Sequence, residues 1–143
     1  MRKIFVLISV IVVTLFCLTG CYEAPQFASP KIAPDEGNII NVEVSSLPER
    51  YNYSFSGENA KAIRNYLSNL NLERDFEENP NEYGGLTWVI SLEYDDGKVL
   101  QIYHFGNMFI RAEGGPWYKM THEEAQRFEE LLDELTSSRF AFT

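Results

Sequence analysis

Residues 86–120 read LTWVISLEYDDGKVLQIYHFGNMFIRAEGGPWYKM, four apolar segments separated by short polar turns. The segments are rich in β-branched and aromatic residues, which favour β-strands. Each turn contains glycine, which adopts the backbone angles that tight hairpins require. The stretch therefore predicts four antiparallel strands joined by hairpins, at residues 86–94, 99–105, 108–112 and 117–120.

The flanking sequence adds two strands and two helices to this prediction. Residues 39–44 and 51–55 have the composition of strands, and a helix is expected to begin near Ser56. A second helix is expected at Thr121, because Thr121 and Glu124 have the spacing of a capping box. Each helix has an apolar stripe at helical spacing: Ala60, Ile63, Leu67 and Leu70 in the first, and Ala125, Phe128, Leu131, Leu132 and Leu135 in the second.

This order of elements predicts the α+β class. We expect an antiparallel β-meander of four strands plus one or two N-terminal strands, packed with two amphipathic helices. Residues 38–143 then form a single globular domain, a length that supports one modest hydrophobic core.

The turn lengths decide which side chains share a face of the sheet. Two-residue turns at Asp96-Gly97 and Gly106-Asn107 place Trp88 and Ile90 on the same face as Tyr103 and Phe105. A three-residue loop with a glycine bulge at the first turn instead pairs Trp88, Ile90 and Leu92 with His104, Ile102 and Leu100. Both registers give two apolar faces, so the second face is either covered by a helix or the N-terminal strands, or left partly open for a partner. The candidate interaction surface consists of His104, Phe109, Arg111, Trp117 and Tyr118.

The charge balance excludes some classes of partner. Twelve Lys and Arg residues against 21 Asp and Glu give a formal net charge of −9 in 143 residues. Phosphate backbones repel such a protein, so nucleic-acid binding is not expected. Docking on anionic lipids through a basic patch is excluded by the same reasoning.

No complete catalytic or metal-binding motif is present. His122-Glu123-Glu124-Ala125-Gln126 lacks the second histidine of a zinc-protease helix, and the acidic segment 71–85 lacks the glycine and glutamate of a calcium loop. Neither a nucleophile motif nor a phosphate-binding glycine loop occurs. We therefore expect no catalytic residue, metal or cofactor. His104, the one histidine within a predicted strand, leaves open an acid/base role beside acidic residues.

The N-terminus carries a targeting pattern. Arg2 and Lys3 precede an uncharged, mostly apolar run of 15 residues, which fits a signal peptide and is shorter than the ~20 residues that span a bilayer. Leu18-Thr19-Gly20-Cys21 follows and resembles the lipobox of bacterial lipoproteins. The resemblance implies removal of residues 1–20 and a diacylglyceryl group on the Cys21 thiol. Two acyl chains anchor a protein stably, so we expect the chain on the extracytoplasmic face of a cell membrane.

Residues 21–37 contain Pro25, Pro30 and Pro34 and are expected to form an extended tether. The region 84–135 is similar to small uncharacterised globular domains of bacterial secreted proteins and lipoproteins, a resemblance that implies no activity. The expected function is a lipid-anchored binding or accessory module, with an envelope protein as a partner. The alternatives are an inhibitor of a secreted enzyme and an envelope hydrolase that uses His104.

Overall fold

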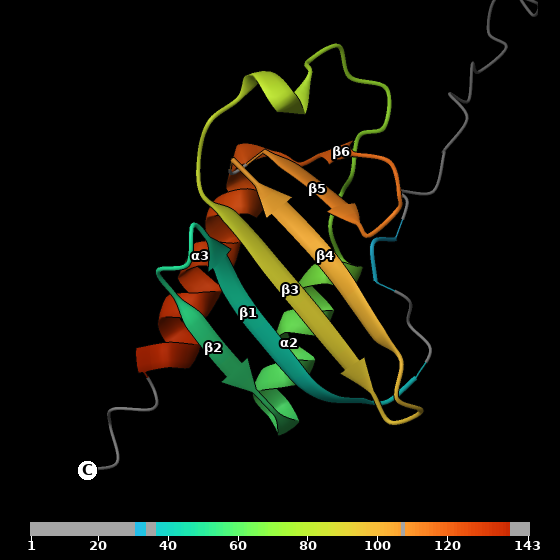
Figure 1. Ribbon diagram of the computed structural model, residues 1–143, viewed down its shortest axis with the longest axis vertical. Helices are drawn as coiled ribbons and strands as arrows, with labels where there is room; N and C mark the ends of the chain where they lie inside the picture. The colour runs from blue at the N-terminus through green and yellow to red at the C-terminus, as the bar shows by residue number, and fades with distance from the viewer. Residues whose placement is uncertain (1–30, 34–36, 107, 138–143) are drawn as a thin grey trace, which may run out of the picture.

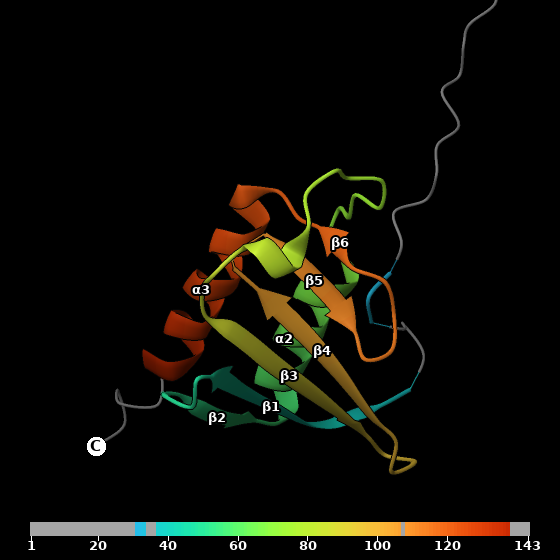
Figure 2. The ribbon, with the colours of Figure 1, turned by 45° about the horizontal axis from the view of Figure 1, so that its top comes forward.

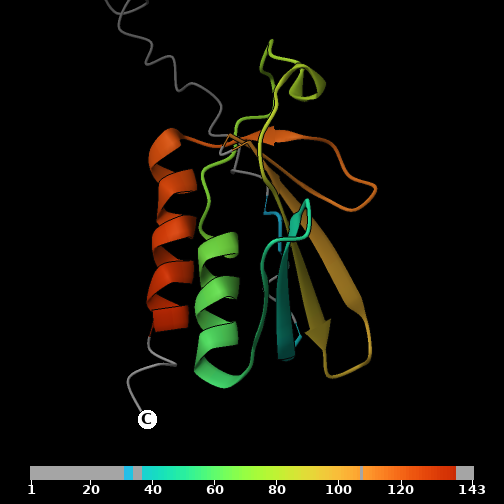
Figure 3. The same ribbon diagram turned by 60° about the vertical axis from the view of Figure 1, so that its left-hand side comes forward.

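The computed structural model describes residues 31–33, 37–106 and 108–137, which form a six-stranded sheet with two helices packed on one face (Figures 1 and 3). This arrangement confirms the predicted α+β class. In chain order the elements are β1 (Ile39–Leu47), β2 (Asn52–Phe55), α2 (Gly57–Ser68), the 3-10 turn η1 (Pro80–Glu82), β3 (Thr87–Tyr94), β4 (Val99–Phe105), β5 (Phe109–Ala112), β6 (Tyr118–Lys119) and α3 (His122–Ser137).

Every neighbouring pair of strands is antiparallel, and the spatial order is β2-β1-β3-β4-β5-β6. Both N-terminal strands join the meander of β3 to β6. β1 pairs with β2 along one edge and with β3 along the other, so its buried side chains lie near the middle of the sheet. This position explains why Val42 and Val44 are fully buried although they lie close to the start of the domain.

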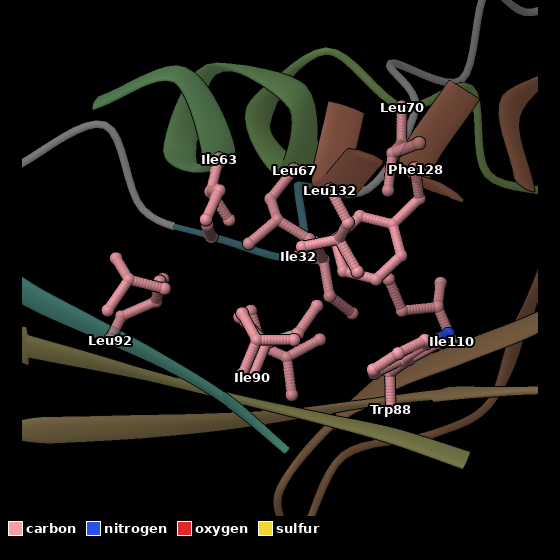
Figure 4. Packing of buried hydrophobic residues seen from close by; sticks show 14 of the residues in the cluster. Ile32, Ile63, Leu67, Leu70, Trp88, Ile90, Leu92, Ile110, Phe128 and Leu132 are labelled. Atoms are coloured by element: carbon pink, nitrogen blue, oxygen red, sulfur yellow. The ribbon is translucent and has the colours of Figure 1, made fainter. Parts of the chain in front are cut away.

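The hydrophobic core fills the space between the helices and the sheet (Figure 4). Ile63 and Leu67 of α2 and Phe128 of α3 face Ile90 and Leu92 of β3, and all five are at most 1% exposed. Burial of such a side chain contributes roughly 1.5–3 kcal/mol to folding.

The predicted tether is not entirely outside the domain. Ile32 and Ala33 are 4% and 0% exposed and belong to the core cluster, so packing against the domain begins before residue 38. Cys21 and the rest of the predicted signal and lipidation segment lie outside the described residues.

The predicted capping box forms at the start of α3. The Glu124 amide donates to the Thr121 hydroxyl over 3.2 Å, and the Thr121 amide donates to Glu124 Oε2 over 3.1 Å. Glu124 Oε1 also accepts from the backbone and side-chain amides of Asn71, at 2.7 and 3.1 Å. The carboxylate therefore joins the first turn of α3 to the segment that follows α2.

The first hairpin turn has the longer loop of the two alternatives. Trp88 pairs with His104 and Ile90 with Ile102, so the register with a three-residue loop and a glycine bulge is confirmed. Gly97 adopts φ +82°, a conformation that glycine accepts without strain. A glycine bulge also adds the right-handed twist that hairpin strands need.

The prediction of a two-residue turn at Gly106-Asn107 is wrong. Phe105 pairs with Phe109 instead of Met108, so three residues separate the paired positions. Because both turns are one residue longer than in the two-residue register, some side chains lie on the opposite face of the sheet from the one that register predicts. Tyr103 and Phe105 lie on the face away from the helices, and His104 lies on the face toward them, because strand neighbours point to opposite sides.

We call the face of the sheet away from the helices the open face. No helix among the described residues covers it, but the segment that contains η1 folds over the ends of β4 and β5 (Figure 2). The two helices lie together on the opposite side of the sheet (Figure 3). The sheet thus has one face devoted to the core and another that is only partly covered.

Candidate functional site

A cluster of aromatic side chains around one arginine lies on the open face. Arg111 of β5 is directly opposite Tyr103 of β4, and its guanidinium carbon lies 5.3 Å from the centroid of the Tyr103 ring. The same carbon lies 4.5 Å from the centroid of the Trp117 ring, which precedes β6. Both distances are typical of cation–π contacts. Arg111 is therefore held by aromatic rings contributed from both sides of its strand.

Arg111 has no acidic partner within the described part of the chain. The ion pairs found there join Lys61 to Glu58, Lys98 to Asp96 and Lys119 to Glu78. The Arg111 Nε atom is buried, and among the described residues it has no hydrogen-bond partner. Arg50, Arg74 and Arg127 also form no ion pair within the described residues, but these three side chains are exposed, whereas Arg111 is half-buried and its Nε is enclosed. The N–H groups of the two Nη atoms, which are not enclosed in this way, are the donors that an anionic group from outside can reach.

A hollow of about 310 Å³ surrounds this cluster. Thr87, Tyr103, Phe105 and Arg111 of the sheet line it, and Trp117 lies beside them. The Phe105 and Trp117 rings lie 6.2 Å apart. Pro80, Asn81 and Tyr83 of the η1 segment complete the lining. Pockets that bind small molecules combine apolar surface with a few placed polar groups in this way.

The η1 segment can reach the sheet because two glycines meet beneath it. A Cβ atom on Gly85 would lie 3.2 Å from the Gly106 Cα, so a larger residue at position 85 would displace the end of β4. The Gly106 amide donates to the Leu86 carbonyl over 3.2 Å. This close approach places Tyr83 beside the open end of the sheet.

The acidic segment 71–85 covers Phe109, an apolar side chain next to the hollow. Phe76 and Tyr83 pack against Phe109 with ring centroids 5.4 and 5.2 Å away, and Phe109 is 0% exposed. Glu78 forms an ion pair with Lys119 of β6, and its hydrogen bond to Lys119 holds the pKa of the Glu78 carboxyl below its usual value. Segment 71–85 therefore packs on the sheet, with aromatic side chains inside and several carboxylates outside.

The structure divides the five residues of the predicted interaction surface into three groups. Arg111 and Trp117 line the hollow. Phe109 lies on the same face but is buried beneath Phe76 and Tyr83, so it offers no surface to a partner. His104 and Tyr118 are on the helix side of the sheet: His104 is fully buried, and Tyr118 packs against the core. The predicted surface is therefore corrected to Arg111 and Trp117.

His104 does not form an acid/base centre. Its ring stacks on Phe128 with centroids 5.0 Å apart, and neither ring nitrogen has a hydrogen-bond partner among the described residues. Burial lowers its pKa from 6.5 to about 4. A neutral histidine enclosed by the core reaches neither water nor a substrate. The hydrolase hypothesis that used His104 therefore loses its base.

Three aromatic lining residues, Tyr103, Phe105 and Tyr83, were missed by the sequence analysis. A two-residue turn at Asp96-Gly97 would place Tyr103 and Phe105 on the face of Trp88 and Ile90, and no position was assigned to Tyr83 from the sequence. The glycine-bulge register considered for the first hairpin supplies the signal for the first two. Applied to the second hairpin as well, it places Tyr103 and Arg111 opposite each other.

A second hollow of about 370 Å³ lies between the helices. Arg127, Glu130 and Glu134 of α3 contribute to its lining together with Tyr66 of α2. Arg127 lines this hollow together with carboxylates of its own helix, so the lining carries both signs of charge. The hollow at Arg111 differs because its cation has no such counterpart.

Neither metal-binding nor membrane-spanning features occur in the described residues. They contain no group of three or more His, Cys, Asp or Glu side chains able to hold a metal ion. None of their helices has the length and apolar character needed to cross a bilayer.

No protein-family model matches this chain, and comparisons with curated proteins and with solved structures gave no match. The function is therefore argued from the site alone.

Proposed function

We propose that this protein is a lipid-anchored lipoprotein of the cell envelope whose domain binds a ligand in the hollow on the open face. The observation that carries the proposal is Arg111, held between aromatic rings beside a hollow and without an acidic partner among the described residues. An arginine that served only to stabilise the fold would gain more from a nearby carboxylate, and this chain has 21 acidic residues. A guanidinium that aromatic rings hold in place, without a carboxylate beside it, favours the binding of an anionic group from solution.

The anchor is proposed from the sequence. Leu18-Thr19-Gly20-Cys21 resembles a lipobox, which would place two acyl chains in the membrane and the domain on its extracytoplasmic side. Partners would then be molecules of the envelope, and the acidic chain disfavours nucleic acid.

The anchor is tested with the two cysteines of the chain. Cys21→Ser is expected to abolish metabolic labelling with a radioactive fatty acid, because the thiol that forms the thioether is removed. Cys17→Ser is the matched control, since Cys17 lies within the predicted signal peptide, and it should label like the wild type. Labelling that persists in Cys21→Ser would contradict the anchor.

Ligand binding is tested by photo-crosslinking of the full chain in its own membranes. Benzoylphenylalanine, which reacts with C–H bonds of peptides and saccharides alike, replaces Tyr83, which is 40% exposed at the rim of the hollow. The control position is Val99, which is 57% exposed at the opposite end of β4. An ultraviolet-dependent adduct is expected at position 83 and not at position 99.

The arginine supplies the second control. Arg111→Gln is expected to reduce the adduct at position 83, whereas Arg127→Gln on the helix side of the molecule leaves it unchanged. If no adduct at position 83 depends on Arg111, the hollow is not a binding site and the proposed function is wrong.

A further inference from the structure

We infer that the hollow at Arg111 takes a saccharide that carries a carboxylate. The inference rests on the proposed function and adds the chemical class of the ligand. Three features of the hollow point to it: a guanidinium without an ion-pair partner in the described part of the chain, the aromatic ring surface around it, and the strand pairing beside it.

The Arg111 guanidinium indicates which charged group the ligand would carry. The guanidinium carbon of Arg111 lies over the rings of both Tyr103 and Trp117, at 5.3 and 4.5 Å from their centroids. The N–H groups of its two Nη atoms can donate to the two oxygens of a carboxylate. The net charge of −9 repels a strongly charged polymer such as a nucleic acid more than a ligand with a single carboxylate at the site.

The aromatic side chains around the hollow indicate which uncharged part of a ligand would fit there. Trp117, Phe105 and Tyr83 present aromatic carbon, while Thr87 and Asn81 add a hydroxyl and an amide. A sugar ring has C–H groups that pack against aromatic faces and hydroxyls that pair with such polar side chains. A volume of about 310 Å³ lies at the lower end of small-ligand pockets, so it fits a small number of sugar rings.

The backbone disfavours an extended peptide. Beside the hollow, β4 is paired with β3 and β5, and β5 is paired with β6. The outer edge of β6 is occupied as well, because Glu73 and Lys119 exchange both backbone hydrogen bonds, at 2.9 and 2.8 Å. A peptide added as a strand needs a continuous free edge, and the pairing of Phe109 and Ile110 with β6 and of Lys119 with Glu73 leaves only short unpaired stretches among the described residues. Recognition there must use side chains.

The two tryptophans of the chain allow a direct test. Trp117 lines the hollow, whereas Trp88 is 7% exposed in the core. The full chain, labelled with ¹⁵N-tryptophan, is extracted in an amine-oxide detergent that contains neither sugar nor carboxylate. Glucuronate, glucose and acetate are titrated at constant ionic strength, and Trp117→Phe identifies which indole N–H signal belongs to Trp117.

Glucuronate is expected to shift the Trp117 signal in a saturable manner and to leave the Trp88 signal in place. Glucose has the same ring without the carboxylate. Its affinity should be lower than that of glucuronate by at least about tenfold, since a charge-assisted hydrogen bond is lost. Acetate, which has the carboxylate without the ring, should also bind more weakly. Arg111→Gln should reduce the affinity for glucuronate to that for glucose, and Arg127→Gln should not change it.

The unchanged Trp88 signal shows that a variant is still folded. Equal affinities for glucose and glucuronate would overturn the carboxylate, and equal affinities for acetate and glucuronate would overturn the saccharide. If glucuronate does not shift the Trp117 signal while the Arg111-dependent adduct at position 83 forms, the ligand is of another class and the proposed function stands. If both experiments fail, the proposed function fails with the inference.

Discussion

The two faces of the sheet are built from alternate residues of the same strands, yet they have different environments. Ile90 and Ile102, on the helix side, are 0% exposed, whereas their neighbours Val89 and Tyr103 on the open face are only partly buried. The helix face gains stability from close packing. The open face keeps an aromatic cluster and an arginine within reach of solvent. One strand can therefore supply folding energy on one side and the residues of the proposed binding site on the other, because its side chains alternate.

The sharpest test of this comparison uses two adjacent residues of β3. Ile90→Ala is expected to lower the free energy of unfolding by about 2–5 kcal/mol, because it leaves a cavity in a fully packed core. Val89→Ala should cost about 1 kcal/mol or less, the scale of strand preference at a partly exposed site. Urea unfolding followed by circular dichroism gives both values. Similar losses in the two variants would show that the open face is packed as tightly as the core.

The next effect comes from His104 and depends on pH. Burial lowers its pKa from 6.5 to about 4, so between these values the unfolded chain binds a proton that the folded chain does not. The stability that comes from neutral His104 is complete above pH 6.5 and is lost as the pH falls toward 4. The shift corresponds to about 3 kcal/mol at its full extent.

His104→Phe should remove most of this loss between pH 6.5 and 4, because the phenyl ring can stack on Phe128 and does not titrate. The other histidine supplies the control. His122 is exposed at the start of α3, so His122→Gln should keep the pH dependence of the wild type. A loss of stability as large in His104→Phe as in the wild type would mean that His104 is not enclosed by the helix face.

The smallest effect is expected at Glu124, where α3 begins. Burial acts to raise the pKa of this carboxyl, but hydrogen bonds from Asn71 and Thr121 outweigh it and keep the pKa below its usual value. The contribution of Glu124 is therefore present above the ordinary carboxylate pKa and is lost as the pH falls below it. Glu124→Gln replaces an acceptor oxygen by an amide donor and should cost about 1–2 kcal/mol near neutral pH.

Glu123→Gln is the matched control for this measurement, because Glu123 is the exposed neighbour in the same helical turn. Urea unfolding at pH 7 should separate the two variants. If Glu124→Gln and Glu123→Gln lower the free energy of unfolding equally, the hydrogen bonds of Glu124 with Asn71 and Thr121 contribute nothing beyond the negative charge in the first turn of α3.

Some of the site could be predicted from the sequence. Arg111 was identified because it lies on the second apolar face of the predicted sheet, and Trp117 because aromatic side chains at a surface often anchor partners. Phe109 could not be separated from them, since the contacts that bury it come from Phe76 and Tyr83, far away in the chain. Tyr103 and Phe105 were assigned to the wrong face by one residue of turn length, which reverses every side chain of a strand.

The sequence by itself determined the element types and the capping box at Thr121 and Glu124, because strand alternation, helical stripes and caps depend on residues within a few positions of one another. It also supplied the lipobox pattern, which needs no fold. Tertiary structure alone decided that β1 lies beside β3, that His104 is enclosed by Phe128, and that Arg111 remains without a carboxylate among the described residues. These outcomes depend on contacts between distant segments, and the small differences in free energy that select among such contacts are not visible in local patterns.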